Sequence, residues 1–389
     1  MATIKLYDLD SYQKTCQGTV VSCVKVAGEE NKYEVILDQT CFFPEEGGQT
    51  SDKGTLGEAK VLDVQIRGDE LVHITDVFLA DGSLVEGMIE WEDRFSKMQQ
   101  HSGEHIFSGL VDKYFGFQNV GFHLSDQIVT MDFDGPLTPE QVEDLEWKVN
   151  QVIAENVAIR GYYPSKEKLK ELSYRSKKEI DGDIRIVEIE GYDKCACCAP
   201  HVARTGEIGG FRIQTVQNYK GGVRISFLCG FRALEESRKQ AKVLSQLTGL
   251  LTTSQDQLAD SVSKLKANNQ NLQYQLNVAR QSLLEVRVAK IPKEQKDVLL
   301  FEGDIEPVIA RNVVNELMKE HEGICGIFMA GENGEYKYIL GSATRDCKQI
   351  AVGMKEELNA RGGGSVNMIQ GSVLAKENEI CRCLGVDYN

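Results

Sequence analysis

The first feature that can do chemistry is a pair of histidines. His101 and His105 stand four positions apart within residues 94–114, where apolar residues recur at helical spacing. On a helix, residues four apart project from one face about one turn from each other. The sequence therefore predicts a helix that presents two imidazoles side by side, a spacing that suits one tetrahedral metal ion.

A second pair with the same spacing follows later in the chain. Cys197 and His201 also stand four positions apart, and Pro200 between them favours a loop over a helix. Together the two pairs offer three nitrogens and one sulfur, a borderline-soft set that favours Zn²⁺ over an iron–sulfur cluster. We expect one zinc ion held by both pairs, and the neighbouring thiols of Cys195 and Cys198 are alternatives to Cys197.

A glycine-rich stretch, residues 42–54, is the third feature. It contains Gly47 and Gly48, which allow positive φ and close approach of the backbone, followed by Gln49, which places an amide beside them. Such a stretch suits close contact with a ligand. The alternative is an ordinary hairpin turn between two strands, and the residues by themselves favour that turn.

The charge balance bears on nucleic-acid binding. The chain has 44 Lys and Arg against 59 Asp and Glu, a net charge of −15, which argues against a non-specific polyanion binder. A structured RNA can still be recognised by a local basic face. Two segments are candidates: residues 166–178, rich in Lys and Arg, and a loop of Arg361, Gly362, Gly363 and Gly364, whose backbone amides suit a phosphate. A solvated helix face and a turn that closes the last sheet are the respective alternatives.

Composition and cysteine usage suggest the compartment. Apolar residues make up 41% of the chain, and no run approaches the roughly 18 apolar residues that span a bilayer, so no membrane contact is expected. The first residues lack the basic and apolar regions of a secretory signal, and we expect a cytoplasmic protein. The 11 cysteines are an odd number and cannot all pair within the chain, which favours metal chemistry over disulfides.

The elements that must position these residues change along the chain. Residues 1–90 contain short β-branched runs separated by turn residues, which is typical of a small sheet or barrel. Residues 91–232 mix helices and strands. A helix is predicted to start after Thr138, which offers an N-cap followed by Pro at the first helical position, and to extend to about Glu155.

The second half of the chain predicts a helical arm and a compact final domain. Residues 233–290 carry leucine at seven-residue intervals, the pattern of a coiled coil. Ser254 and Gln257 have capping-box spacing, so we expect two helices that form an antiparallel arm or, alternatively, a parallel zipper between two chains. Residues 291–389 alternate strands and helices, which predicts a small α/β domain.

Taken together, the motifs resemble a known family. The Phe-Phe-Pro-Glu-Glu-Gly-Gly-Gln, His-Ser-Gly-Glu-His and Cys-Cys-Ala-Pro-His stretches have the order and spacing found in the editing domain of alanyl-tRNA synthetase and in its freestanding relatives, the AlaX-type alanyl-tRNA editing proteins. This resemblance covers roughly residues 1–232. The final part of the chain resembles the DHHA1-type domain of the synthetase and of the long AlaX forms.

With this resemblance we expect an α+β protein of four parts. They are an N-terminal β-barrel domain (1–90), a zinc-containing α+β editing domain (91–232), a helical arm or coiled coil (233–290) and a C-terminal α/β DHHA1-like domain (291–389). A homodimer through the arm or through the last domain is a further expectation.

The resemblance also implies an activity. It implies a hydrolase that cleaves the ester between a wrong amino acid, chiefly Ser and also Gly, and the 3′ end of tRNA(Ala). The family's zinc ligands correspond to His101, His105, Cys197 and His201, and its pocket glutamine corresponds to Gln49. Since only a β-rich segment precedes the editing region, we expect action in trans, without ATP, on tRNA charged by another enzyme.

A mechanism for such a site has one unresolved point. Zinc is expected to polarise the ester or a water, while Gln49 and the backbone amides of Gly47 and Gly48 orient the aminoacyl group. Four protein ligands, however, close a tetrahedral zinc. Either one ligand such as Cys197 is loose, or the metal becomes five-coordinate, or zinc only positions the terminal adenosine. His123 is a candidate base.

A different class of function keeps the same ligands. In a non-catalytic, zinc-stabilised module for tRNA binding or dimerisation, the metal would be purely structural. This alternative does not require a pocket around Gln49.

Overall fold

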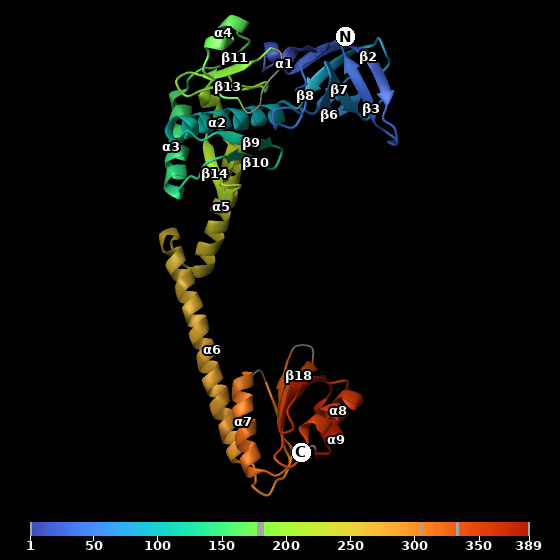
Figure 1. Ribbon diagram of the computed structural model, residues 1–389, viewed down its shortest axis with the longest axis vertical. Helices are drawn as coiled ribbons and strands as arrows, with labels where there is room; N and C mark the ends of the chain where they lie inside the picture. Colours follow the sequence, from blue (N-terminus) through green and yellow to red (C-terminus); the bar gives the residue numbers. More distant parts are fainter. Residues whose placement is uncertain (1, 177–182, 304, 332–333, 388–389) are drawn as a thin grey trace. The chain divides into compact units, whose positions relative to one another are not determined.

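The computed structural model describes residues 2–176, 183–303, 305–331 and 334–387. It contains two compact units, Met1–Leu244 and Ser245–Asn389, which we describe one at a time. Both units combine helices with sheets, so the predicted mixed α+β fold is confirmed (Figure 1). Among the described residues, no helix is both long and apolar enough to cross a bilayer.

The first unit begins with six strands that close into a barrel in the order β2-β3-β7-β6-β5-β8 (Figure 1). These strands are β2 (Thr15–Lys25), β3 (Tyr33–Leu37), β5 (Gly54–Leu56), β6 (Ala59–Arg67), β7 (Glu70–Thr75) and β8 (Leu84–Ile89). Buried and exposed residues alternate along β8, as they do when one face of a strand covers a core. The short elements β1 (Ile4–Lys5), α1 (Leu6–Leu9) and β4 (Gln39–Thr40) precede or interrupt the barrel. Residues 41–53, which contain the Gly-Gly-Gln stretch, connect β4 to β5.

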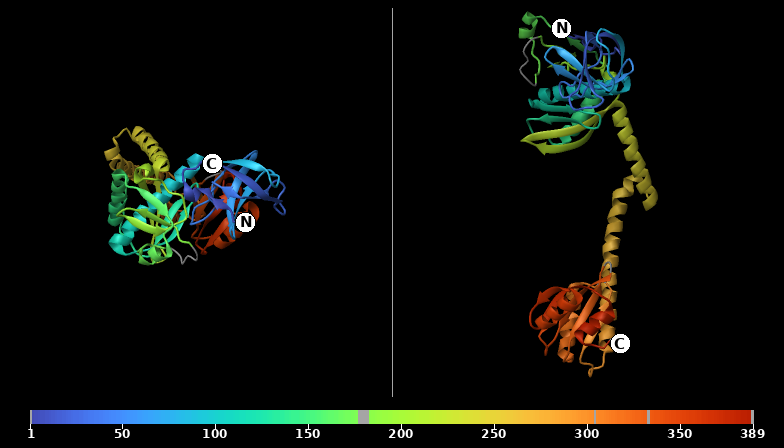
Figure 2. Two further views of the ribbon diagram at one scale, coloured as in Figure 1. Left: turned by 90° about the horizontal axis from the view of Figure 1, so that it is seen from above. Right: turned by 90° about the vertical axis from the view of Figure 1, so that its right-hand side faces the viewer.

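Helix α2 (Trp91–Phe115) is the centre of the rest of this unit. It lies between a four-stranded sheet, β14-β15-β10-β9, and a three-stranded sheet, β11-β12-β13 (Figures 1 and 2). The strands are β9 (Asn119–Leu124), β10 (Val129–Phe133), β11 (Ile159–Tyr162), β12 (Ile186–Ile189), β13 (Asp193–Ala196), β14 (Phe211–Tyr219) and β15 (Gly222–Cys229). Because both sides are covered, every residue from Lys97 to Val111 is buried. The polar side chains in this stretch must therefore find partners inside the protein.

Shorter helices complete the first unit. The predicted helix after Thr138 is α3 (Pro139–Glu155), and Thr138 forms a capping box with Gln141, as the sequence indicates. Helix α4 (Lys166–Glu171) and the 3₁₀ turn η1 (Thr205–Ile208) follow. The end of the expected basic segment, residues 177–178, lies outside the described residues.

Two helices occupy the region where a helical arm is expected. They are α5 (Gly230–Leu251), which crosses the boundary between the two units, and α6 (Leu258–Ala289), with the 3₁₀ turn η2 (Gln255–Gln257) before α6. The predicted break is confirmed, but the predicted capping box is wrong. Ser254 makes no side-chain capping bond, because a 3₁₀ turn and not an α-helix starts there. Leu265 and Leu272 of the heptad pattern are exposed on α6.

The second unit ends in a five-stranded sheet in the order β16-β17-β18-β20-β19. Its elements are β16 (Val298–Glu302), α7 (Pro307–Glu320), β17 (Cys325–Ala330), β18 (Glu335–Gly341), α8 (Cys347–Leu358), β19 (Arg361–Gly364), β20 (Met368–Leu374) and α9 (Glu377–Leu384). β16 and β17 are parallel and are joined by the crossover helix α7, while the other pairs are antiparallel. This arrangement confirms the predicted alternation of strands and helices.

One expectation about this unit is wrong. Arg361, Gly362, Gly363 and Gly364 do not form a loop but the edge strand β19, which pairs with β20 in antiparallel register. A glycine run has low β propensity and suggests a turn. Here the absence of side chains lets the strand approach its neighbour, since a Cβ at Gly371 would lie 1.9 Å from the carbonyl oxygen of Arg361.

Candidate metal centre

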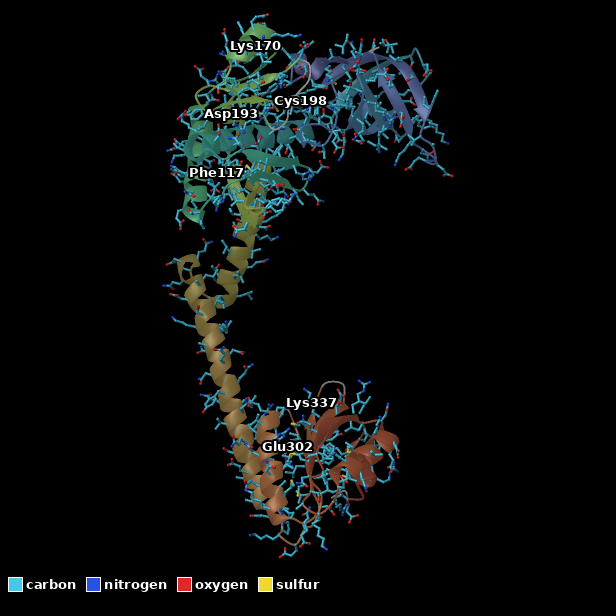
Figure 3. The ribbon with its side chains drawn as sticks, in the orientation of Figure 1. Phe117, Lys170, Asp193, Cys198, Glu302 and Lys337 are labelled. Atoms are coloured by element: carbon cyan, nitrogen blue, oxygen red, sulfur yellow. The ribbon has the colours of Figure 1, made fainter. Side chains whose placement is uncertain are left out.

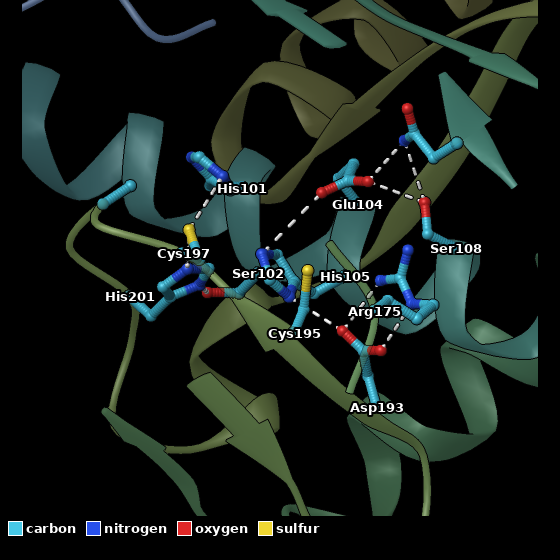
Figure 4. Close-up of polar contacts among 12 residues, drawn as sticks. His101, Ser102, Glu104, His105, Ser108, Arg175, Asp193, Cys195, Cys197 and His201 are labelled. Atoms are coloured by element: carbon cyan, nitrogen blue, oxygen red, sulfur yellow. Dashed lines mark hydrogen bonds and ion pairs between the residues drawn. The ribbon is translucent and has the colours of Figure 1, made fainter. Parts of the chain in front are cut away.

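The two predicted ligand pairs meet in the first unit. His101 and His105 project from α2, while Cys197 and His201 come from the turn that follows β13 (Figure 4). One ligand atom from each of the four residues lies within 4.8 Å of the others. The three histidines are buried and Cys197 is partly exposed. The structure thus brings together all four residues that the spacing singled out.

Each imidazole is held by a partner at Nδ1. The Oε1 atom of Gln49 lies 3.0 Å from Nδ1 of His101, and a carboxylate oxygen of Asp193 lies 2.8 Å from Nδ1 of His105. Both oxygens only accept, so these two rings donate from Nδ1, which leaves Nε2 as the atom that can bind a metal ion. The hydroxyl of Ser102 lies 3.0 Å from Nδ1 of His201 and is the hydrogen-bond partner of the third ring.

The Nε2 atoms face the thiol. Sγ of Cys197 lies 3.5 Å from Nε2 of His101 and 3.5 Å from Nε2 of His201. Three imidazole nitrogens and one sulfur thus converge, which is the arrangement that a metal ion needs.

At His201 and Cys197 the surroundings favour the protonation state that binds a metal ion. Burial lowers the pKa of His201 to about 3, so this imidazole is neutral. Burial by itself would raise the pKa of Cys197, but the neighbouring imidazoles lower this pKa well below its ordinary value and favour the thiolate. At His105 burial lowers the pKa, but Asp193 and Cys197 outweigh it and raise the pKa to about 9. A metal ion that binds His105 therefore displaces a proton.

The Gly-Gly-Gln stretch forms a tight turn beside the cluster. Gly47 and Gly48 have φ of +63° and +85°, and Glu46 and Gln49 pair across the turn. The hairpin-turn interpretation is therefore right for the backbone. The buried Gln49 side chain nevertheless reaches His101, so the same turn is part of the candidate site.

Strand β9 fixes the position of this turn. The Leu124 N–H donates to the carbonyl of Gly48 at 2.6 Å, and the Thr50 N–H donates to the carbonyl of Leu124 at 3.1 Å. A Cβ at Gly48 would lie 2.2 Å from the carbonyl oxygen of Phe122, so only glycine allows this approach. The Phe122 ring also covers His101, with ring centroids 4.8 Å apart.

Helix α2 anchors the segment that follows the turn. Arg94 and Lys97 stand seven and four positions before His101 and share the helix face of the histidine pair. The buried Arg94 guanidinium pairs with the buried carboxylate of Asp52. Lys97 Nζ donates to the carbonyl of Ser51 at 2.8 Å. One helix face thus holds both the turn and two metal ligands.

The other predicted residues have different outcomes. Cys195 is buried next to His105 and Asp193. Cys198 lies beside the Gly-Gly turn, where a Cβ at Gly47 would be 3.6 Å from its sulfur. Figure 3 labels Cys198 and Asp193 in the first unit. Of the three neighbouring thiols, Cys197 alone belongs to the group of four. His123 is exposed on β9 and is not a member of the cluster. Arg361, Gly362, Gly363 and Gly364 belong to the second unit and are exposed there.

Sequence reasoning missed the residues that support the ligands. Ser102, Asp193 and Arg175 were not singled out, because a serine, an aspartate and an arginine at long separations carry no spacing signal. Glu104 was also missed. Its carboxylate is buried, accepts from Ser108 Oγ at 2.6 Å and from Asn119 Nδ2 at 2.5 Å, and lies 3.9 Å from Nε2 of His105. The one available signal was the placement of Ser102 and Glu104 inside the His-Ser-Gly-Glu-His motif.

Comparison with known proteins identifies relatives over most of the chain. Residues 184–226 match the family described as threonyl and alanyl tRNA synthetase second additional domain, and residues 8–93 match class II (A) tRNA synthetases. Alanyl-tRNA editing protein Aarsd1 of Rattus norvegicus is 29% identical over 93% of this chain and 92% of its own length. Alanyl-tRNA editing protein AlaX-L of Pyrococcus horikoshii is 25% identical over 97% of this chain and 96% of its own length.

Two further matches concern alanyl-tRNA synthetases. The alanine–tRNA ligase of Ignicoccus hospitalis is 28% identical over 94% of this chain, which spans 40% of the ligase. A solved structure, the C-Ala domain of Aquifex aeolicus alanyl-tRNA synthetase, matches 23% of this chain with 17% identity and a TM-score of 0.20, too low to support a shared fold. The resemblance found in the motifs is confirmed by these relatives: over nearly its full length the chain is similar to alanyl-tRNA editing proteins of the Aarsd1 and AlaX-L type, and it is also similar to part of an alanine–tRNA ligase.

Proposed function

We propose that this protein is a trans-editing hydrolase that deacylates mischarged tRNA(Ala), chiefly Ser-tRNA(Ala) and also Gly-tRNA(Ala). The observation that carries the proposal is the hydrogen bond between Gln49 and His101 at 3.0 Å. It joins a cluster suited to a metal ion to a glycine turn suited to an aminoacyl group. Relatives named as alanyl-tRNA editing proteins, aligned over more than nine tenths of the chain, support it.

We further propose that His101, His105, Cys197 and His201 hold Zn²⁺. Zinc–sulfur bonds of about 2.3 Å and zinc–nitrogen bonds of about 2.0–2.1 Å at a tetrahedral angle place sulfur and nitrogen about 3.5 Å apart. The two measured Sγ to Nε2 distances are both 3.5 Å. The residues therefore fit zinc in donor type and in spacing.

The need for such a site follows from the limits of amino-acid selection. One methyl or hydroxyl group changes binding in an apolar pocket by only about 1–3 kcal/mol, so a synthetase built for alanine accepts some serine and glycine. A second site can select the error by polar contacts. Gln49 Nε2 and Thr50 Oγ1 are buried and, within the described part of the chain, have no hydrogen-bond partner. We assign them to the polar groups of the aminoacyl moiety, since a buried unpaired donor gains most from a new acceptor.

The chain's own residues can then prepare the ester for hydrolysis. A bound zinc would act as a Lewis acid that polarises the ester carbonyl or a water. Gln49 holds the acyl group against the cluster, and the backbone amides of the exposed Gly47 and Gly48 are donors for its carbonyl oxygen. Cys197 is the partly exposed member of the ligand set, so it is the ligand whose release would open a position.

Other parts of the chain receive supporting roles in this proposal. We assign the barrel (1–90), the editing domain (91–232), the helical arm (233–290) and a DHHA1-like domain (291–389) as separate parts. The exposed glycine strand Arg361–Gly364 is the candidate tRNA contact, with Arg361 for phosphate and Gly362, Gly363 and Gly364 for close backbone approach. The exposed leucines of α6 are the candidate surface for a homodimer.

Hydrolysis of Ser-tRNA(Ala) by wild type, Gln49→Ala and His101→Ala tests this proposal. Wild type should release serine, and both variants should lose most of the activity. Gln217→Ala is the matched control, because Gln217 is exposed on β14 in the same unit. Retained hydrolysis by His101→Ala with confirmed loss of metal would contradict a metal-dependent site. Unaltered tRNA binding without hydrolysis by wild type would favour the non-catalytic module.

A further inference from the structure

We infer that Asp193 and Arg175 form a positioning pair that sets the orientation of His105 towards a bound metal ion. Neither residue is a ligand in the group of four, and no motif in the sequence points to either. The inference rests on the proposed metal centre, but it concerns the geometry of the site and not the identity of the substrate.

The contacts define a chain of three side chains (Figure 4). His105 Nδ1 donates to Oδ2 of Asp193 at 2.8 Å. Arg175 donates to the same carboxylate through two nitrogens, from Nε to Oδ1 at 2.8 Å and from a terminal nitrogen to Oδ2 at 2.9 Å. Because both oxygens are held by the guanidinium fork, the carboxylate cannot rotate about its axis. The imidazole that depends on it is fixed in the same way.

Burial makes this pairing strong. The Asp193 side chain is 1% exposed and the Arg175 side chain is 10% exposed. A buried carboxylate needs a cation, and here the guanidinium supplies it and leaves His105 Nε2 for the metal.

The backbone is shaped to bring these residues together. A Cβ at Gly109, one turn beyond His105 on α2, would lie 2.4 Å from the carbonyl oxygen of Tyr192 and 2.9 Å from Cβ of Asp193. Glycine at this position therefore lets the turn before β13 approach the helix. On the other side, the Arg175 N–H donates to the carbonyl of Lys194 at 2.8 Å, which docks the arginine segment along β13.

A second metal ion is the alternative explanation. His105, Asp193 and Cys195 are close enough to form a group of three potential ligands. Arg175 argues against it, because the guanidinium already occupies both carboxylate oxygens with a positive charge. We therefore assign Asp193 to orientation of His105 and leave Cys195 outside the coordination.

Zinc affinity of the full chain tests the pair. Competition against a chromophoric chelator is measured for wild type, Asp193→Asn and Arg175→Lys. Asp193→Asn should weaken zinc binding by about 10–100-fold, the usual effect of losing a partner of a metal-bound histidine. Arg175→Lys keeps the charge but loses the fork, so it should give a smaller loss. In Co²⁺-loaded protein, both variants should change the visible absorption, which reports ligand geometry.

The chain offers a matched control. Asp132 and Arg224 form a fork of the same kind, with two bonds of 2.7 Å, on β10 and β15 of the same unit. Asp132→Asn should leave zinc affinity and the Co²⁺ spectrum unchanged. If Asp193→Asn fails to fold by circular dichroism, Arg175→Lys decides. Wild-type affinity and spectrum in a folded Arg175→Lys, or in both variants, would overturn the inference.

The alternative and the proposed function give separate results. Two zinc ions per chain, or a loss of affinity in Cys195→Ser equal to that in Asp193→Asn, would support the second ion and refute the positioning pair. Hydrolysis of Ser-tRNA(Ala) is measured on the same samples. If Asp193→Asn weakens zinc binding while wild type fails to hydrolyse the substrate, the positioning pair is supported and the proposed function is not.

Discussion

Removal of the Arg94 guanidinium should strongly destabilise the first unit. Arg94 and Asp52 are 0% and 1% exposed, and the Arg94 Nε atom lies 3.0 and 2.9 Å from the two carboxylate oxygens. Arg94 also donates to the carbonyl of Cys41 at 2.7 Å. Arg94→Met keeps the apolar stem but leaves the Asp52 charge buried with one backbone donor, the N–H of Phe43. Loss of one partner of a buried ion pair costs about 3–5 kcal/mol.

Tryptophan fluorescence makes this measurement specific. The chain has two tryptophans, Trp91 and Trp147, and both belong to the first unit. Urea unfolding of the full chain followed by this signal therefore reports that unit alone. We expect a free energy of unfolding about 3–5 kcal/mol below wild type for Arg94→Met. Part of the loss should return in Arg94→Met/Asp52→Asn, which removes the unpaired charge.

Arg67→Met is the matched control for this experiment. Arg67 forms a two-nitrogen fork with Glu34 at 2.6 Å for both bonds, but the side chains are 56% and 27% exposed. Solvated pairs contribute little, so this variant should unfold like wild type. A wild-type midpoint for Arg94→Met, or an equal loss of unfolding free energy in Arg67→Met, would refute the argument that burial makes the Arg94 pair important for stability.

Three further predictions concern the same unit. Gly48→Ala should lower the free energy of unfolding of the first unit by about 2–5 kcal/mol, because the added Cβ would clash with the Phe122 carbonyl and the residue has a φ of +85°. Gly47→Ala should lower it by only about 1–2 kcal/mol. Urea titrations followed by tryptophan fluorescence compare the two variants. Burial lowers the pKa of His73 to about 4, so the folded unit resists a proton that the unfolded chain takes up. Stability should therefore fall by about 3 kcal/mol as pH drops from about 6.5 to 4, and a shallower fall in His73→Gln would confirm the source; equal slopes would exclude it. Removal of zinc by a chelator should lower the thermal midpoint of the metal-loaded protein. The lost stability should be about 2.7 kcal/mol if free zinc was initially at 100 times its Kd. In calorimetry, His101→Ala should show no such change on chelation.

Local patterns predicted the parts of the site that are local. Two pairs of ligands four apart, a helix with apolar periodicity and a Thr-Pro cap are encoded within a few residues, and all were found as expected. The contact between Gln49 and His101 was not predictable from spacing, because it depends on how the barrel docks on α2. The supporting residues Asp193 and Arg175 escaped for the same reason.

Errors came from places where pairing or geometry overrides local preference. The sequence of Arg361–Gly364 predicts a loop, since glycine disfavours strands. In the structure this segment pairs with β20, which also contains a glycine, and forms the edge strand of the sheet. Ser254 and Gln257 have the right spacing for a capping box, but the chain makes a 3₁₀ turn there. In both cases the deciding contact lies outside the motif that was read.

The shared face of α2 has a consequence for how the protein can be divided. Arg94 and Lys97 hydrogen-bond to the segment that follows Gln49, and His101 on the same face hydrogen-bonds to the Gln49 side chain. A rotation of the helix by one residue, about 100°, would break the contacts of Arg94 and Lys97 and would also move both histidine ligands away from the site. A fragment that began at Trp91 would keep all four ligands yet leave His101 without its acceptor. The part of the chain before Trp91 thus contributes Gln49 to the candidate metal centre, and the part that begins at Trp91 contributes the four ligands. Neither part contains the complete site when it is separated from the other.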